Sequence, residues 1–148
     1  MSVAAPRTAD EERVWQILEA IADPEIPVIS IVDLGIVRKV LVSADGVEVG
    51  LTSTYSGCPA TDVIQRLVGE SLAYHGIKAK IRMLLSPAWT TDWISTEGRR
   101  KLGDYGIAPP RLLAASNIDA VIANDEAVAC PRCHSERTER LAEFGSTR

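Results

Sequence analysis

The chain has 148 residues, 46% of them hydrophobic and 24% charged, which is ordinary for one soluble globular domain. Its net charge of −4 argues against a nucleic-acid-binding protein, because such proteins bind phosphates through clustered Lys and Arg. The single basic run, Arg99 to Lys101, is interpreted as a solvated helix face.

The N-terminal residues 1–6 lack the apolar core of a signal peptide, and no apolar run approaches the ~20 residues of a membrane-spanning helix. We therefore expect a cytoplasmic protein without membrane contact. In that compartment the three cysteines are reduced thiols or metal ligands rather than a disulfide framework.

A first helix is predicted close to the N-terminus. Thr8 and Glu11 match the S/T-x-x-E capping box. Pro24 disfavours the helical conformation at the residue before it, so the helix should end near Asp23. Apolar residues recur at helical spacing between these signals, at Val14, Ile17, Leu18 and Ile21.

Two strands and a tight turn are predicted next. β-branched residues are frequent from Gly35 to Val42, and Asp45-Gly46 separates this run from alternating apolar residues over 47–51. The alternation indicates an antiparallel pair with one packed face and one solvated face.

A second helix and a third strand follow. Pro59 suits the first helical position and Gly76 suits the C-terminal cap. Residues 79–85 alternate apolar and basic side chains, which predicts a half-buried strand. The helix has one apolar stripe, formed by Val63, Ile64, Leu67, Val68 and Leu72.

The order α-β-β-α-β predicts an α/β (α+β) fold, a small mixed sheet of about three strands covered by helices. We assign residues 1–110 to this domain, 111–129 to an extended arm and 130–148 to a separate short tail. Within the domain, Thr91 or Asp92 could cap a third helix that Gly98 interrupts.

Cys58 lies between the end of a predicted strand and the start of a predicted helix. Unpaired N–H groups at a helix N-terminus favour thiolate over thiol, and so raise nucleophilicity and metal affinity. The hydroxyls of Thr52 and Thr54 could line the same rim. The alternative, that Cys58 is a small buried hydrophobic residue, stays open.

The loop from Asp23 to Gly35 contains two prolines and three carboxylates, at Asp23, Glu25 and Asp33, with no adjacent Lys or Arg. It could bind a metal or a basic patch of a partner. The alternative is that Asp23 and Asp33 brace turns, as short acidic side chains often do.

Cys130 and Cys133 form a C-x-x-C pair followed by His134. Half of a zinc ribbon fits this pair better than haem attachment or a thioredoxin-like redox site. A closed zinc site needs four ligands, and no second pair occurs before Arg148. Zinc is therefore an unsettled cofactor here, and other ligands could come from His75, Cys58 or a second subunit.

Aromatic residues concentrate in one segment, at Trp89, Trp93 and Tyr105. Large amphipathic rings dominate binding interfaces, so this segment could be a partner-docking surface. Equally, the rings could close the open face of a three-stranded sheet.

Two motifs, DPEIPVISIVDLG and LTSTYSGCPA, resemble the signature of a family that includes SufT-type proteins and cytosolic iron–sulfur targeting factors. The resemblance spans Trp15 to Leu85. It implies an α/β domain for iron–sulfur or metal-centre assembly, with Cys58 as the reactive cysteine and Asp23, Glu25 and Asp33 as the acidic loop.

The later segments WTTDWISTEGRRKLGDYGIAPP, CPRC and TERLAEFGST resemble the PaaD branch of accessory proteins. That branch implies maturation of the phenylacetyl-CoA epoxidase, with its reductase and oxygenase components as partners and a transient iron or iron–sulfur cluster as cargo. A homodimer is compatible with it. Chains of this branch continue into a second cysteine pair, so Cys130 and Cys133 are carried over as half a site.

Three functions compete: an assembly factor that holds metal at Cys58, a structural subunit that docks through residues 89–105, and a thiol enzyme. A thiol enzyme needs a base. The two histidines are His75, about 17 residues from Cys58, and His134 in the tail. No triad is evident, which makes the enzyme the weakest of the three hypotheses.

Overall fold

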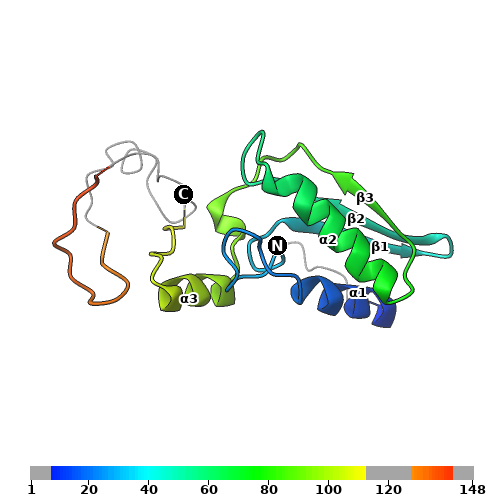
Figure 1. Ribbon diagram of the computed structural model, residues 1–148, viewed down its shortest axis with the longest axis horizontal. Helices are drawn as coiled ribbons and strands as arrows, with labels where there is room; N and C mark the ends of the chain where they lie inside the picture. The colour runs from blue at the N-terminus through cyan, green and yellow to red at the C-terminus, as the bar shows by residue number, and fades with distance from the viewer. Residues whose placement is uncertain (1–7, 113–127, 142–148) are drawn as a thin grey trace.

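The computed structural model describes residues 8–112 and 128–141. In Figure 1, α3 lies beyond the end of the sheet, and residues 128–141 lie beyond α3. The elements in chain order are α1 (Ala9–Glu19), β1 (Val37–Ser43), β2 (Gly46–Leu51), α2 (Ala60–Tyr74), β3 (Ala79–Met83), the 3₁₀ turn η1 (Thr91–Trp93) and α3 (Thr96–Tyr105).

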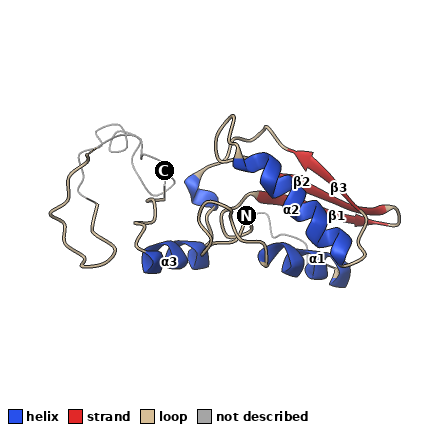
Figure 2. Cartoon of the chain, viewed as in Figure 1, coloured by secondary structure: helices blue, strands red, loops and turns tan. Residues whose placement is uncertain are grey.

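The three strands form one mixed sheet in the order β1-β2-β3, which confirms the predicted fold class (Figure 2). β1 and β2 are antiparallel, whereas β2 and β3 are parallel and are connected through α2. Antiparallel neighbours need only a tight turn, and parallel neighbours need a crossover, so the sheet has the connections that its chain order permits.

The core lies between one face of the sheet and the two helices α1 and α2. α1 contacts β1, α2 contacts β3, and the two helices contact each other. Full burial of a Leu, Ile or Val side chain contributes roughly 1.5–3 kcal/mol. Fully buried apolar side chains come from α1, the central strand β2 and α2, at Val14, Leu18, Val49, Leu51, Val68 and Leu72.

α1 begins as predicted but ends earlier. The Thr8 side chain accepts from the Glu11 N–H and the Glu11 carboxylate accepts from the Thr8 N–H, a complete capping box. The helix ends at Glu19 rather than near Asp23. The reason is tertiary: Ala22 pairs with Ser30, and the Asp23 N–H donates to the Ile29 carbonyl.

The third helix differs from the prediction. Thr90 caps the η1 turn, and Ser95, rather than Thr91 or Asp92, caps α3. Gly98 lies inside α3 and does not interrupt it. A Cβ at Gly98 would lie 3.1 Å from the Asp33 carbonyl oxygen and from a methyl of Ile29, so glycine here permits close packing of α3 on the loop.

The basic run on α3 is also different from expectation. Only Arg100 forms the solvated face, pairing with Glu97 and Asp104. Arg99 donates to backbone carbonyls, including that of Thr91 at 2.6 Å, and Lys101 donates to Asp33 at 2.7 Å.

Most of the predicted arm, residues 113–127, lies outside the described residues. In the part of the chain that the structure describes, no helix combines the length and apolar character needed to cross a membrane.

Candidate functional site

Cys58 lies in the loop that joins β2 to α2, two residues before the helix begins at Ala60. Its side chain is half-buried, and its carbonyl accepts the N–H of Thr61 at 3.2 Å. The thiol therefore lies at the positive end of the α2 dipole, the position predicted from the sequence. The first N–H groups of a helix have no intrahelical carbonyl to donate to, so this end of α2 presents unpaired donors.

A cavity of about 220 Å³ lies beside this thiol. Loop 23–26, β2, α2, β3 and α3 all contribute to its wall. Five of the six residues predicted for metal transfer line it together: Asp23, Glu25, Thr52, Thr54 and Cys58. The deeper wall is buried and apolar, and includes Leu34, Ile36, Leu51, Ile64, Ile94 and Leu102.

The two carboxylates at the cavity differ in their surroundings. Asp23 is buried, and its Oδ1 accepts the N–H groups of Glu25 at 2.9 Å and Ile26 at 2.8 Å. Asp23 therefore shapes the turn as well as lining the cavity. Glu25 is exposed, so its carboxylate can meet an incoming ligand without losing an internal partner within the described residues.

Asp33 does not line the cavity with the other acidic residues. Its carboxylate accepts from Lys101 Nζ at 2.7 Å and from Ser95 Oγ at 2.6 Å. Burial raises the pKa of Asp33, but the hydrogen bonds from Lys101 and Ser95 outweigh burial and hold that pKa below its ordinary value. This carboxylate fastens α3 to the loop.

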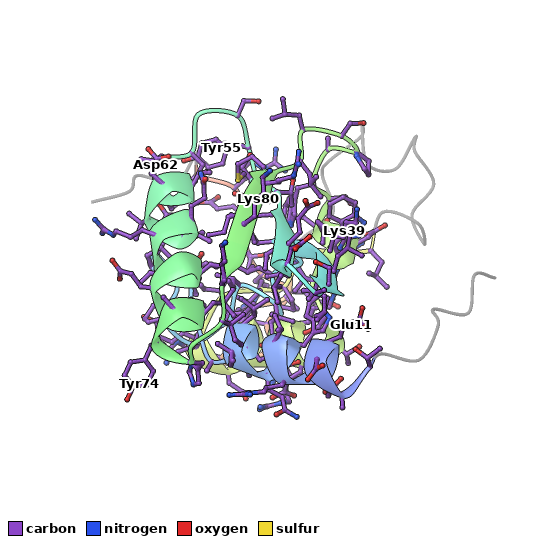
Figure 3. The ribbon with its side chains drawn as sticks, turned by 90° about the vertical axis from the view of Figure 1, so that its right-hand side faces the viewer. Glu11, Lys39, Tyr55, Asp62, Tyr74 and Lys80 are labelled. Atoms are coloured by element: carbon purple, nitrogen blue, oxygen red, sulfur yellow. The ribbon has the colours of Figure 1, made fainter. Side chains whose placement is uncertain are left out.

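Tyr55 is a site residue that sequence reasoning missed. A hydrogen bond to Cys58, reinforced by the charge of the thiolate, raises the pKa of Tyr55. Figure 3 shows Tyr55 and Asp62 together at the N-terminal end of α2, opposite Tyr74. The available signal was a tyrosine three residues before the cysteine in an otherwise small, polar loop.

The three aromatic residues of the predicted docking segment do not share one environment. Trp89 lines the cavity and donates its indole N–H to the Leu34 carbonyl at 2.8 Å. Trp93 is half-buried, with the Arg38 guanidinium 3.6 Å from its ring centre. Tyr105 is 49% exposed. A docking role for this segment stays a prediction.

Cys130 and Cys133 form a compact turn in the C-terminal segment. The N–H groups of Cys133 and Arg132, followed by the Cys133 side chain, lower the pKa of Cys130. The His134 N–H donates to the Cys130 carbonyl at 2.8 Å, and His134 has a positive φ of 58°. Such N–H groups stabilise a thiolate ready to bind metal, and the half-site assignment stays a prediction.

Within residues 8–112 and 128–141, no three His, Cys, Asp or Glu side chains are grouped to hold a metal ion. Neither thiol site therefore has a complete ligand set among these residues. Any metal bound at Cys58 must draw its further ligands from elsewhere.

Residues 11–86 match the family described as iron–sulfur cluster assembly protein, which is just over half of the chain. The chain belongs to that family. Residues 115–148 match a second family, the PaaD zinc beta ribbon domain. The assembly-family match contains Cys58 and all of the acidic loop, and the ribbon match contains Cys130 and Cys133.

Two relatives support this membership. An Escherichia coli strain K12 protein, provisionally named as one of the subunits of 1,2-phenylacetyl-CoA epoxidase, is 41% identical over 99% of this chain and 86% of its own. An Fe-S protein maturation auxiliary factor of Porphyromonas gingivalis is 41% identical over 63% of this chain and 90% of its own. These relatives support a role in iron–sulfur maturation or a related accessory function.

Two solved structures, each covering about two thirds of this chain, share its fold. A domain of unknown function (DUF59) from Bacillus anthracis aligns with a TM-score of 0.59 and 27% identity, covering 63% of this chain and 91% of its own. A conserved hypothetical protein from Thermotoga maritima aligns with a TM-score of 0.52 and 26% identity, covering 66% and 95%. The α+β fold of the assembly-family domain is thereby established.

Proposed function

We propose that this protein holds iron or an iron–sulfur cluster transiently at Cys58 and delivers it to a component of the phenylacetyl-CoA ring-epoxidising oxygenase. The observation that carries the proposal is the position of Cys58, at the N-terminal end of α2 and on the rim of a cavity with two carboxylates. Thiolate sulfur is the ligand that iron–sulfur clusters use.

The incomplete ligand set supports a carrier rather than a permanent metal site. A closed structural site holds its metal with four protein ligands. Cys58 offers one thiolate, and Asp23 and Glu25, although they line the same cavity, are not grouped with it as a metal site within the described residues. A metal held this way can leave when a recipient protein presents more thiolates. Cysteine ligands of the recipient would then replace Cys58, with no change in oxidation state.

The proposed recipients are the iron–sulfur reductase and the di-iron oxygenase components of the epoxidase. Support comes from the name of the Escherichia coli relative, which places that protein in an epoxidase system. We also propose the division into a domain of residues 1–110, an arm of 111–129 and a ribbon-like tail of 130–148. A homodimer would double the number of thiolates at a shared cluster.

A thiol enzyme receives less support. None of the described residues that line the cavity is a histidine. His75 caps the far end of α2, about 22 Å from the helix start at a rise of ~1.5 Å per residue. Its Nδ1 lies 2.8 Å from the Ser71 carbonyl on its own helix. A base within hydrogen-bond reach of Cys58 is therefore not supplied by a described histidine.

Anaerobic reconstitution tests the carrier function. Wild type, Cys58→Ser and Cys133→Ser are incubated with ferrous iron and sulfide, desalted, and assayed for iron, sulfide and visible absorbance. We expect wild type and Cys133→Ser to retain cluster, and Cys58→Ser to lose most of it. Equal retention by Cys58→Ser would reject Cys58 as the ligand.

A structural subunit that docks through residues 89–105 is the second candidate, favoured by the exposure of Tyr105. Co-purification of Trp93→Ala and Tyr105→Ala with the epoxidase components tests it. Loss of co-purification with unchanged melting supports docking. If Trp93→Ala unfolds instead, Trp93 belongs to the packing of the domain, and the partner surface must be sought at the acidic loop.

A further inference from the structure

The cavity beside Cys58 is larger than packing alone explains. Protein interiors are close-packed, and voids bigger than a water molecule are few. This one measures about 220 Å³. An apolar cavity of roughly 150 Å³ is enough to bind benzene. A phenyl or isobutyl group therefore fits here, with room for the atoms that attach it.

The lining separates into an apolar floor and a polar rim. The floor includes Leu34, Ile64 and Leu102, each at most 8% exposed. Solvent reaches the lining at Glu25 and Cys58. A ligand would therefore bury its apolar end among these side chains and leave its polar end beside the thiol.

The charge of the lining excludes several ligand classes. None of the described lining residues is Lys, Arg or His, whereas two are the carboxylates Asp23 and Glu25. A free carboxylate, a phosphate or a coenzyme A ester would bring negative charge toward these groups without a cation to receive it. A neutral side chain carried on a peptide backbone brings no charge toward these carboxylates. The hydroxyls of Thr52 and Thr54 can hydrogen-bond to that backbone.

We propose that this cavity binds an apolar side chain of the protein that receives the metal, of the size of a Phe or Leu side chain. The inference rests on the proposed carrier function and adds how the recipient is recognised. A buried apolar anchor in a pocket supplies binding energy at the centre of an interface. With that anchor in place, the Cys58 thiol faces the recipient chain, and its cysteines can replace Cys58 as ligands.

Small amides test the cavity without the recipient. The full-length apo protein, labelled with ¹⁵N, is titrated with N-acetyl-phenylalanine amide, N-acetyl-leucine amide, N-acetyl-glycine amide and phenylacetate. Burial of one apolar side chain contributes roughly 1.5–3 kcal/mol, so the first two should bind about 10- to 100-fold more tightly than the glycine amide. No preference over glycine amide overturns the proposal, and tighter binding of phenylacetate does so in favour of a small-molecule ligand.

Filling the cavity gives a second test. Ile64→Phe adds bulk from α2 into the cavity, and should weaken binding of the phenylalanine amide at least 10-fold. The matched control is Val63→Phe, on the same helix but outside the lining. If Ile64→Phe does not fold, Leu102→Phe fills the cavity from α3. Unchanged binding in a folded, cavity-filled variant overturns the proposal.

The amide titrations use apo protein, so they are independent of cluster reconstitution. Loss of cluster binding with intact amide preference would reject the carrier function and keep the cavity as an apolar side-chain site. Intact cluster binding without amide preference would keep the carrier and reject this mode of recognition.

Discussion

The two thiol regions of the molecule are built in opposite ways. The surroundings of Cys58 come from loop 23–26, β2, α2, β3 and α3, which are distant in sequence. The surroundings of Cys130 come from the next few residues, because its thiolate is stabilised by N–H groups of Arg132 and Cys133. The first site therefore depends on the whole fold, and the second depends on a local turn.

Because of this difference, a substitution in the domain should affect the two thiols unequally. A change that loosens the packing of the loop or of α3 should expose Cys58 and leave Cys130 unaltered. Alkylation of each cysteine, followed by mass spectrometry, reports the two sites in one sample.

The largest loss of stability is expected from Gly35→Ala. Gly35 has a φ of +72°, and a Cβ there would lie 2.7 Å from the carbonyl oxygen and from the Cβ of Trp93. Left-handed backbone costs a non-glycine residue about 1–3 kcal/mol, and the clash adds about 1–3 kcal/mol. We expect a loss of about 2–6 kcal/mol in the free energy of unfolding, measured in urea, and faster alkylation of Cys58 alone.

Gly76→Ala is the matched control for that variant. Gly76 has the same φ of +72°, but its Cβ would meet no atom within 4 Å. It should cost only the backbone component, about 1–3 kcal/mol. Equal losses in the two variants would show that Trp93 does not pack closely on Gly35.

The second effect concerns Asp33 and Lys101. Because its pKa is lowered in the folded protein, Asp33 contributes stability above its unfolded pKa of ~3.9, and this is lost as pH falls through the folded pKa. Lys101→Met should therefore cost about 1–3 kcal/mol at pH 7 and flatten the decline in stability below pH 4. Urea unfolding from pH 2 to pH 7 measures both.

Arg100→Met controls for loss of a charge on the same helix. Arg100 is exposed and pairs with Glu97 and Asp104, and exposed ion pairs contribute little to stability because solvent screens them. If Lys101→Met and Arg100→Met lose the same stability at pH 7, and both keep the wild-type decline in stability below pH 4, Asp33 does not fasten α3 to the loop.

The elements that sequence predicted best are those with local signals. The capping box at Thr8 and the turn between β1 and β2 depend on neighbouring residues, and both are confirmed. The predicted end of α1 and the predicted break in α3 were wrong because both depend on contacts across the fold. Glycine inside a helical pattern suggests a break, whereas Gly98 permits contact with Asp33.

The candidate site was predictable to the same extent. The location of Cys58 at a helix start follows from Pro59 and the strand before it, and the structure agrees. Grouping Asp33 with the acidic loop missed Lys101, which is 68 residues away in sequence. Tyr55 was missed too, because the spacing of apolar residues in a sequence does not predict hydrogen bonds between side chains of an irregular loop.

A smaller effect is expected in the titration of Tyr55. Its pKa is raised by Cys58, so it should titrate above the ordinary value of ~10. Cys58→Ser removes the thiolate and should return the pKa of Tyr55 toward that value, whereas Cys130→Ser should not. ¹³C NMR of labelled tyrosine rings from pH 8 to pH 12 measures it. An unchanged titration in Cys58→Ser would place the two side chains out of contact.

The smallest effect is expected at the tail. Cys130→Ser with Cys133→Ser should leave the melting temperature of the proposed 1–110 domain unchanged within about 1 °C, because the proposed two-ligand half-site cannot supply the folding energy of a closed zinc site. The N–H groups that lower the pKa of Cys130 belong to the same turn, so replacing the two sulfur atoms changes contacts within that turn and not in the core. Thermal melts with and without chelator, on wild type and the double variant, measure this. A chelator-dependent drop in wild type that the double variant lacks would reveal a complete metal site, and Cys130 would then be coupled to the fold as Cys58 is.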